Sequence, residues 1–266
     1  MYDFKDISII THVRIDTTER ERNAYLRHQY YWQNCKNLEF VYVEDDDSMK
    51  LPEVIKEKSK YQWLHNPWEF KKTSSYNVGA TMTTRKYFIF LDLDCIIHPE
   101  HILESVEKLK KNENLGLILP YNGVAIYLSH KTKNKFTTDC DYKVFEDIFP
   151  TTFQVNYQNE DLLIGNNQAV GGAVMTTREK FKAFKGFNPN FQGWGFEDNE
   201  LPARVHKLGF DVVKLASKKQ VLWHLPHDGE GASNKEHNPH YRNNNKICSY
   251  VEQCTKEELK EYITQW

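Results

Sequence analysis

The sequence predicts an α/β fold, a single Rossmann-like domain with a mostly parallel central sheet flanked by helices. Three observations lead to this prediction. Apolar runs of strand length alternate with helix-length segments through the first 120 residues. Several of these runs are apolar along most of their length, which is typical of strands buried on both faces. No internal repeat and no low-complexity linker divides the 266 residues.

The expected strands end at turn residues and follow one another in the chain. They are Ile7–Ile10, Glu39–Glu44, Tyr61–Leu64, Tyr87–Asp94, Leu115–Pro120, Ala169–Thr176, Asp211–Leu215 and Gln220–Leu225. The expected helices lie between or after these strands, and two of them open with a capping box, at Thr18-x-x-Glu21 and Thr255-x-x-Glu258. They are Thr18–Asn34, Pro52–Ser59, Ser74–Thr84, Pro99–Lys111, Arg178–Phe184, Glu197–Leu208 and Thr255–Trp266. Polar stretches at 131–142 and 227–246 are expected to be a surface turn and a loop.

Composition and charge narrow the function classes. A formal net charge of −2 does not favour a general nucleic-acid binder. Aromatic residues make up 14% of the chain, which indicates either a ring-rich core or a stacking surface for sugars or bases. Five scattered cysteines without a C-x-x-C pair favour reduced thiols in a cytosolic protein. The sequence contains no signal peptide and no run of membrane-spanning length, so any membrane association is expected to be peripheral.

Two carboxylates lie at the end of the most apolar predicted strand. Asp92 and Asp94 end the run "FIFLDLD", and strand alternation directs both to the same side. Their mutual repulsion fits a divalent cation held by oxygen ligands, Mn²⁺ or Mg²⁺, although two solvated turn acids are the other interpretation. At a second strand end, His224 and His227 are either structural or bring imidazoles to the same sheet edge as Asp94.

Two further features bear on ligand binding. Arg14 follows the first strand directly and is suited to hold a phosphate, whereas no P-loop and no G-x-G-x-x-G occurs. The stretch "NFQGWGFEDNEL" sets Trp194 between two glycines ahead of Glu197 and Asp198. It is either a turn followed by simple helix capping, or a ring that stacks on a sugar beside a general base.

These segments together resemble nucleotide-sugar glycosyltransferases of the GT-A fold. The C-terminal motif is similar to the galactosyltransferase/N-acetylgalactosaminyltransferase type, also seen in chondroitin-type polysaccharide polymerases. The resemblance follows "IITHVR", "FKKTSSYNVGA", "FIFLDLDCIIHP", the long segment from "VGGAVMTTREKF" to "GWGFEDNELPARVHKLG", and "HLPH". It departs from the family at Thr11–Val13, where a proline is usual, at Arg85 and at Phe196, and these departures bear on which sugar is transferred.

The resemblance implies one domain, residues 1–266. Residues 1–120 would form its nucleotide-binding half, and residues 121–266 would form its acceptor-binding and catalytic half. The implied catalytic base is Asp198. The implied sugar-binding residues are Trp194, Glu197, Gly171, Gly172 and Gly193. The implied nucleotide-binding residues are Arg14, Glu44, Asp45, Lys72, Asn77 and Asp92, the last at the ribose or the metal shell. The implied metal ligands are Asp94 and His227, with His224 as a second histidine.

The resulting expectation is an inverting, Mn²⁺-dependent hexosyltransferase, with Mg²⁺ as the alternative ion. It moves a hexose, N-acetylhexosamine or uronic acid from a UDP-sugar to a carbohydrate acceptor, in surface polysaccharide (capsule) or glycoconjugate synthesis. A cytoplasmic location, at most peripheral to the inner face of the membrane, is expected. Two alternatives remain open: a nucleotidyl- or phosphotransferase that uses the same D-x-D, and a catalytically inactive sugar-binding module.

Overall fold

A seven-stranded mixed sheet forms the centre of the computed structural model, which describes residues 1–139, 143–144, 171–217, 219–227 and 238–266. Its strands, in spatial order, are β11 (Asp211–Lys214), β8 (Leu115–Leu119), β10 (Ala173–Thr177), β6 (Tyr87–Leu91), β2 (Ile7–Val13), β4 (Glu39–Asp46) and β5 (Lys60–His65). Neighbouring strands are parallel except at β10, which runs antiparallel to both β6 and β8. The predicted α/β class with a mostly parallel sheet is therefore confirmed.

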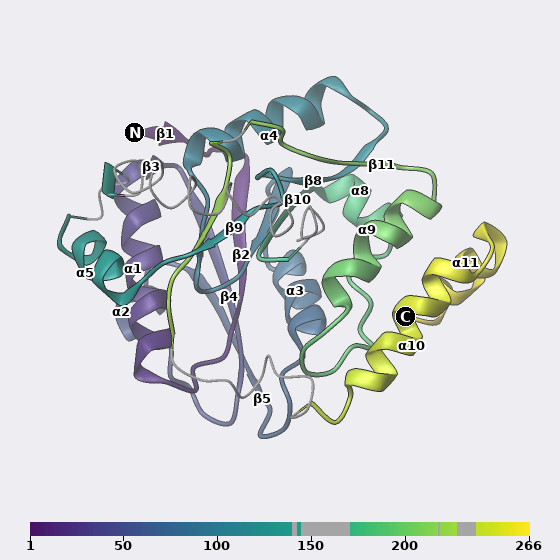
Figure 1. The fold of residues 1–266 in the computed structure, drawn as a ribbon, viewed down its shortest axis with the longest axis horizontal. Coiled ribbons are helices and arrows are strands. Elements are labelled where there is room, and N and C mark those ends of the chain that lie inside the picture. The colour runs from purple at the N-terminus through teal and green to yellow at the C-terminus, as the bar shows by residue number, and fades with distance from the viewer. Residues whose placement is uncertain (140–142, 145–170, 218, 228–237) are drawn as a thin grey trace, which may run out of the picture.

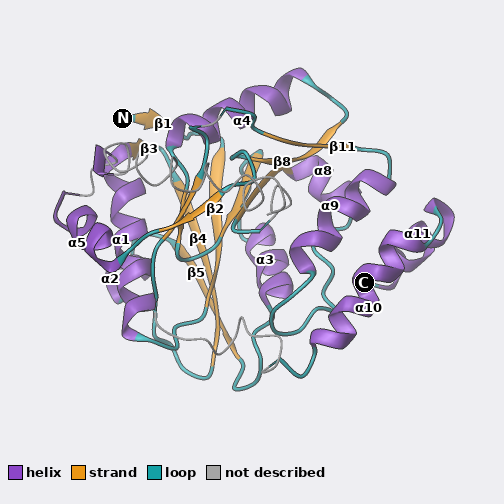
Figure 2. Cartoon of the chain, viewed as in Figure 1, coloured by secondary structure: helices purple, strands orange, loops and turns teal. Residues whose placement is uncertain are grey.

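Helices cover both faces of this sheet, as an α/β layer arrangement requires. Figure 1 shows α1 and α5 on one side of the strands and α3 and α9 on the other, and Figure 2 shows the same layers by element type. The bounds are α1 (Thr18–Asn34), α2 (Glu53–Lys56), α3 (Lys72–Thr81), α4 (Pro99–Lys111), α5 (His130–Asp139), α8 (Arg178–Ala183), α9 (Glu197–Lys207), α10 (Tyr241–Gln253), α11 (Lys256–Tyr262) and the 3₁₀ helix Ile263–Gln265. Within the described ranges, no helix combines the length and apolarity needed to cross a bilayer.

Short strands complete the fold and bring the late histidines to the sheet edge. β1 (Tyr2–Asp3) pairs with β3 (Cys35–Lys36), and β7 (Cys95–Ile96), β12 (Leu222–His224) and β9 (Ala125–Tyr127) form a small third sheet. In that sheet His224 lies opposite Cys95. The pairing therefore sets His224 beside the residue that directly follows Asp94.

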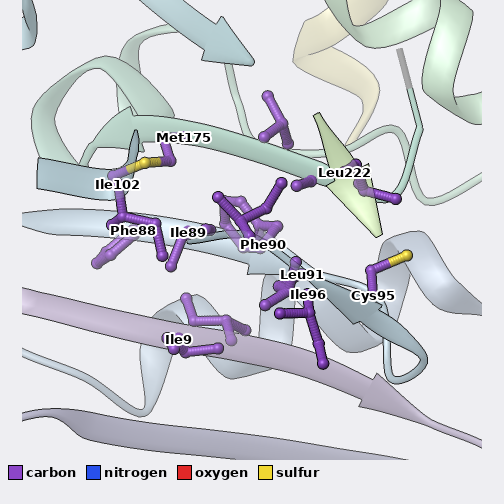
Figure 3. Close-up of a cluster of buried hydrophobic side chains, with 14 of the residues drawn as sticks. Ile9, Phe88, Ile89, Phe90, Leu91, Cys95, Ile96, Ile102, Met175 and Leu222 are labelled. Carbon is purple, nitrogen blue, oxygen red and sulfur yellow. The ribbon is translucent and has the colours of Figure 1, made fainter. Parts of the chain in front are cut away.

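The main core runs through the sheet and reaches the small sheet. Figure 3 shows Phe88, Phe90 and Leu91 of β6 packed between Ile9 of β2 and Met175 of β10, with Cys95 and Leu222 at one end of the cluster. All of these side chains are buried. Burying so much apolar surface on both sides of β6 fixes the position of its carboxyl end, where the two aspartates follow.

Three local predictions are corrected by the structure. The N-cap of α1 is Thr17, whose side chain accepts from Arg20 N, and not the predicted Thr18 box. The segment expected as a surface turn forms α5, because Phe136 is buried in the core and the nearly buried Lys133 pairs with Glu19. The end of the predicted 227–246 loop is the first turns of α10, in which Asn244 is buried. The capping box at Thr255 is confirmed, with both reciprocal bonds present.

Candidate active site

A cavity of about 320 Å³ opens where the carboxyl ends of β2 and β6 meet the small third sheet. Ligands of open α/β sheets bind at this edge. The cavity collects many of the predicted site residues from both halves of the chain: Arg14, Lys72, Asp92, Asp94, Gly171, Gly172, Trp194, Glu197, Asp198, His224 and His227. The proposed boundary between the two halves stays a prediction.

The two aspartates after β6 face different partners. The strand ends at Leu91, so strand alternation does not place these side chains, although both line the cavity. Asp92 accepts from the Tyr76 hydroxyl at 2.6 Å and lies 3.3 Å from Lys72 Nζ. Asp94 lies against His224 and His227. The turn therefore splits the D-x-D pair between two groups of side chains.

Asp94, His224 and His227 form a compact carboxylate–imidazole group. Asp94 Oδ2 lies 3.0 Å from His227 Nε2, and Asp94 Oδ1 lies 3.6 Å from His224 Nε2. One ligand atom from each residue lies within 4.8 Å of the others. Burial opposes ionisation of Asp94, but the hydrogen bond from His227 and the nearby His224 outweigh it and hold the pKa of Asp94 below its usual range. An ionised carboxylate with two imidazoles is a donor set that suits Mn²⁺.

The tautomer of His224 fits a cation at this position. His224 Nδ1 lies 2.9 Å from the Leu225 carbonyl, which can only accept, so a neutral His224 carries its proton on Nδ1 and has a free lone pair on Nε2. That lone pair faces the Asp94 carboxylate, and two acceptors in contact need a proton or a metal ion between them. Backbone carbonyls commonly orient metal-bound histidines in this way. The residues present therefore fit a divalent metal.

A second group gathers three carboxylates around one ammonium. Lys72 Nζ lies 3.3 Å from Asp92, 3.5 Å from Glu197 and 3.2 Å from Asp198. Burial disfavours the charge of Lys72, but the three carboxylates outweigh it and raise its pKa well above the usual value. The lysine is therefore a permanent cation at the wall of the cavity.

Asp198 is the titratable group of this cluster whose pKa approaches neutrality. Burial is the largest effect and raises the pKa of Asp198. Lys72 lowers this pKa, and the neighbouring charges of Glu197 and Asp92 raise it, so that the pKa is about 7. A carboxylate with a pKa near 7 is poised to act as a general base at neutral pH. Glu197 differs, because its second oxygen accepts from Gly195 N at 2.9 Å and its side chain is 3% exposed.

The loop that carries Trp194 has unusual backbone dihedral angles on both sides of this residue. Gly193, Gly195 and Phe196 have φ angles of 62°, 115° and 69°, in the region where side chains are disfavoured. Phe196 is the N-cap of α9 without a side-chain cap, so the acid pair does not serve as a capping residue. Trp194 is 37% exposed at the cavity, and its ring stacks on Tyr241 of α10 with centroids 6.0 Å apart.

Gly171 and Gly172 form the cavity floor. A Cβ at Gly171 would lie 2.5 Å from Asp198 Oδ2, and one at Gly172 would lie 2.7 Å from Leu222 Cδ1 and 3.2 Å from Cys95 Sγ. Any side chain at Gly171 would therefore displace the Asp198 carboxylate. The residues other than Gly193 that were predicted to bind sugar all line the cavity, and Gly193 supports the loop by donating to the Phe70 carbonyl at 2.8 Å.

The structure does not bring all predicted nucleotide-binding residues to the cavity. Glu44 is buried and accepts from Lys50 N, Leu51 N and the Tyr61 hydroxyl, so its carboxylate is occupied by the loop after β4. Asn77 exchanges two hydrogen bonds with the Phe187 backbone.

Asp45 also lies behind the cavity wall, not on it. It accepts from Lys71 N and from Asn66, and it faces His12 at 3.6 Å. The Arg14 guanidinium does line the cavity, and it donates to the Asp45 carbonyl at 3.1 Å.

Among the lining residues that sequence reasoning missed, Arg20, Tyr127 and His12 carry polar side chains. Arg20 lies in the first turn of α1, and its Nε is 3.3 Å from Asp16, so the remaining guanidinium nitrogens add a cation to the cavity. Its position just beyond the first strand was the available signal. Tyr127 is 72% exposed and its ring lies 4.6 Å from that of His224. His12, which the sequence marks only as part of a departure from a family pattern, is the next-to-last residue of β2 and lines the cavity with Arg14.

Comparisons with known proteins agree with this geometry. The model of glycosyl transferase family 2 matches residues 10–176, and the model described as the N-terminal domain of galactosyltransferase matches residues 152–228. Beta-1,4-galactosyltransferase 6 of Rattus norvegicus is 29% identical over 82 residues, 31% of this chain and 22% of that protein. A putative polypeptide N-acetylgalactosaminyltransferase 13 of Drosophila melanogaster is 25% identical over 142 residues, 52% of this chain and 25% of that protein.

Among solved structures, the mannosyltransferase PcManGT from Pyrobaculum calidifontis, in complex with GDP-Man and Mn²⁺, is similar in fold. Its TM-score is 0.52 at 12% sequence identity, over 84% of this chain and 58% of that chain. The fold and the site define a GT-A glycosyltransferase with a galactosyltransferase-type C-terminal motif. The chain belongs to glycosyl transferase family 2, whose model covers more than half of it. It spans about a quarter or less of the length of the curated relatives it matches.

Proposed function

We propose that this chain transfers a hexose, N-acetylhexosamine or uronic acid from a UDP-sugar to a carbohydrate acceptor with inversion. One observation carries the proposal. A carboxylate with a pKa of about 7, Asp198, shares a single cavity with the exposed ring of Trp194 and with the carboxylate–imidazole group of Asp94. A sugar held on the ring would have a hydroxyl near the base and its leaving group near the metal-binding residues.

The metal-binding residues of the proposal are Asp94, His224 and His227. Mn²⁺ is the favoured ion, because the donor set suits it and because the structurally similar mannosyltransferase was solved with Mn²⁺. When bound, such an ion neutralises the charge of the departing diphosphate. Arg14 and Arg20 add fixed cations to the cavity lining, where they would hold phosphate oxygens.

The chain's own residues then act on the acceptor. Trp194 positions the sugar face, and Glu197, fixed by the Gly195 amide, accepts a hydrogen bond from a sugar hydroxyl. Asp198 takes the proton of the attacking hydroxyl. That oxygen forms a bond to the anomeric carbon from the face opposite the diphosphate, the bond to the phosphate oxygen breaks, and UDP leaves with the electron pair. A single displacement of this kind inverts the anomeric configuration.

A donor screen tests the proposal. UDP release is measured from UDP-hexoses, UDP-N-acetylhexosamines and UDP-uronic acids, with and without Mn²⁺, and with an oligosaccharide acceptor. We expect acceptor-stimulated, Mn²⁺-dependent UDP release with at least one donor, and a product of inverted configuration by NMR. Absence of UDP release with every donor, or a product of retained configuration, would contradict the proposal.

The same assay separates the two alternatives. A nucleotidyltransferase that uses the Asp94 site would release pyrophosphate and not UDP, and a sugar-binding module without activity would release neither. The exposed ring of Trp194 favours the glycosyltransferase, because it offers a sugar a stacking surface beside the Asp198 carboxylate. We also propose a role in surface-polysaccharide or glycoconjugate synthesis in the cytoplasm, which a screen of oligosaccharide acceptors tests.

A further inference from the structure

Lys72 makes contacts that a phosphate-binding lysine does not need. It opens α3, and its side chain is only 11% exposed. Its ammonium has three hydrogens and faces three carboxylates, those of Asp92, Glu197 and Asp198. A cation in the first turn of a helix also faces the positive end of the helix dipole, which disfavours it. The three carboxylates offset this penalty, so the lysine belongs to the carboxylate cluster.

The three carboxylates differ in how else they are held. Asp92 also accepts from the Tyr76 hydroxyl, and Glu197 also accepts from Gly195 N. Among the described residues, Asp198 has hydrogen bonds from Lys72 alone, at 3.2 Å to each of its two oxygens. On its other side Asp198 meets the bare backbone of Gly171. Removing Lys72 would therefore leave Asp92 and Glu197 held but Asp198 free to rotate.

We propose that Lys72 is the positioning residue of Asp198 and joins it to Asp92 on the donor side of the cavity, instead of binding the donor phosphates. This inference rests on the proposed function, in which Asp198 is the base. The distances support it, because an ammonium that already contacts three carboxylates at 3.2 to 3.5 Å has no hydrogen left for a phosphate. Arg14 and Arg20 are the lining cations that remain for the diphosphate.

Lys72→Met tests the inference, and Lys71→Met is the matched control, because Lys71 is the exposed neighbour and only its backbone N–H contacts the site wall. Three quantities are measured for each variant: the affinity for UDP with Mn²⁺ by calorimetry, kcat and KM for transfer, and the pH dependence of kcat. Lys72→Arg serves as the conservative variant that retains the charge. Lys72→Gln, which keeps a donor without the charge, replaces Lys72→Met if that variant does not fold.

We expect Lys72→Met to bind UDP within about twofold of wild type, while kcat at pH 7 falls about 100-fold, as for a misplaced reacting group. The acidic limb of the pH profile should move to higher pH, because Lys72 lowers the pKa of Asp198. Lys72→Arg should leave the pH of the acidic limb unchanged and restore part of kcat. Lys71→Met should equal wild type in UDP affinity, kcat and pH profile.

Two outcomes would overturn the inference. The first is a loss of UDP affinity of tenfold or more with an unchanged pH limb, which would make Lys72 a phosphate ligand. The second is a Lys72→Met variant whose kcat and pH limb equal those of wild type. A wild-type protein that transfers no sugar from any donor would instead overturn the proposed function itself, so the two failures are distinguishable.

Discussion

Replacing Asp198 by Asn should remove activity and stabilise the fold at the same time. Asn has nearly the same shape but cannot accept a proton, and loss of a general base lowers kcat by about 10² to 10⁴-fold. The affinity for UDP should stay near that of wild type, since the nucleotide side of the cavity is untouched. A variant that is more stable but inactive would show that the wild-type carboxylate serves activity although it lowers the free energy of unfolding.

The size of the stabilisation follows from the pKa of Asp198, raised from 3.8 to about 7 by burial and by Glu197 and Asp92. Between these two pH values the folded state binds more protons than the unfolded state, so stability falls as pH rises through this window. The full shift corresponds to an upper bound of ~4 kcal/mol. Because the side chain is 31% exposed and solvent screens it, we expect about half of that, ~2 kcal/mol, for the ionised form above pH 7.

The assay is thermal unfolding of wild type and Asp198→Asn at pH 8 and at pH 5. At pH 8 the variant should melt about 4 °C higher, using about 2 °C for each kcal/mol in a chain of this size. At pH 5 folded Asp198 is protonated but the unfolded carboxyl, with its ordinary pKa of 3.8, is still ionised, so about a third of the difference, ~1.5 °C, should remain. Equal melting temperatures at pH 8, or the same difference at both pH values, would refute the assigned pKa.

Three further predictions concern other parts of the cavity. His227→Gln should weaken Mn²⁺ binding by about 10 to 100-fold in calorimetry without metal-independent loss of fold; unchanged affinity would remove His227 from the ligand set. Gly171→Ala should lower kcat about 100-fold with little change in UDP affinity, because its Cβ would lie 2.5 Å from Asp198 Oδ2; a wild-type kcat would show that the Asp198 carboxylate can move without loss. Arg20→Met should reduce UDP affinity about tenfold, in keeping with the loss of a charge-assisted hydrogen bond; an affinity equal to that of wild type would exclude Arg20 from the donor site.

Patterns of local sequence predicted the regular elements well. The helix expected at Pro99–Lys111 has these bounds in the structure, because a proline opens it and a row of apolar residues faces the core. The segment around Phe136 was mistaken for a turn because its sequence is polar. Its burial depends on contacts with distant parts of the chain, such as the pairing of Lys133 with Glu19, which no local pattern reveals.

The residues that line the cavity were predicted less completely than the helices and strands. Residues that follow strand ends, such as Asp94 and His224, could be found from sequence because the carboxyl ends of strands meet at one edge. Glu44 also lies near such an end and Asn77 lies in α3, but neighbouring backbone groups occupy their polar atoms. The partner of a polar side chain depends on loop geometry, so no local pattern places Lys72 against its three carboxylate neighbours.

The stacking of Trp194 on Tyr241 means that the Trp194 side of the cavity is built partly by α10. Tyr241 also contacts Phe196, at 4.9 Å between ring centroids, and Asn238 donates to the Trp194 carbonyl. The segment 193–196, which contains three positive φ angles, is therefore held in place by α10, a helix more than 40 residues further along the chain. A tag, fusion or deletion at α10 would therefore disturb the Trp194 loop, and under the proposed function it would change acceptor choice more than donor binding.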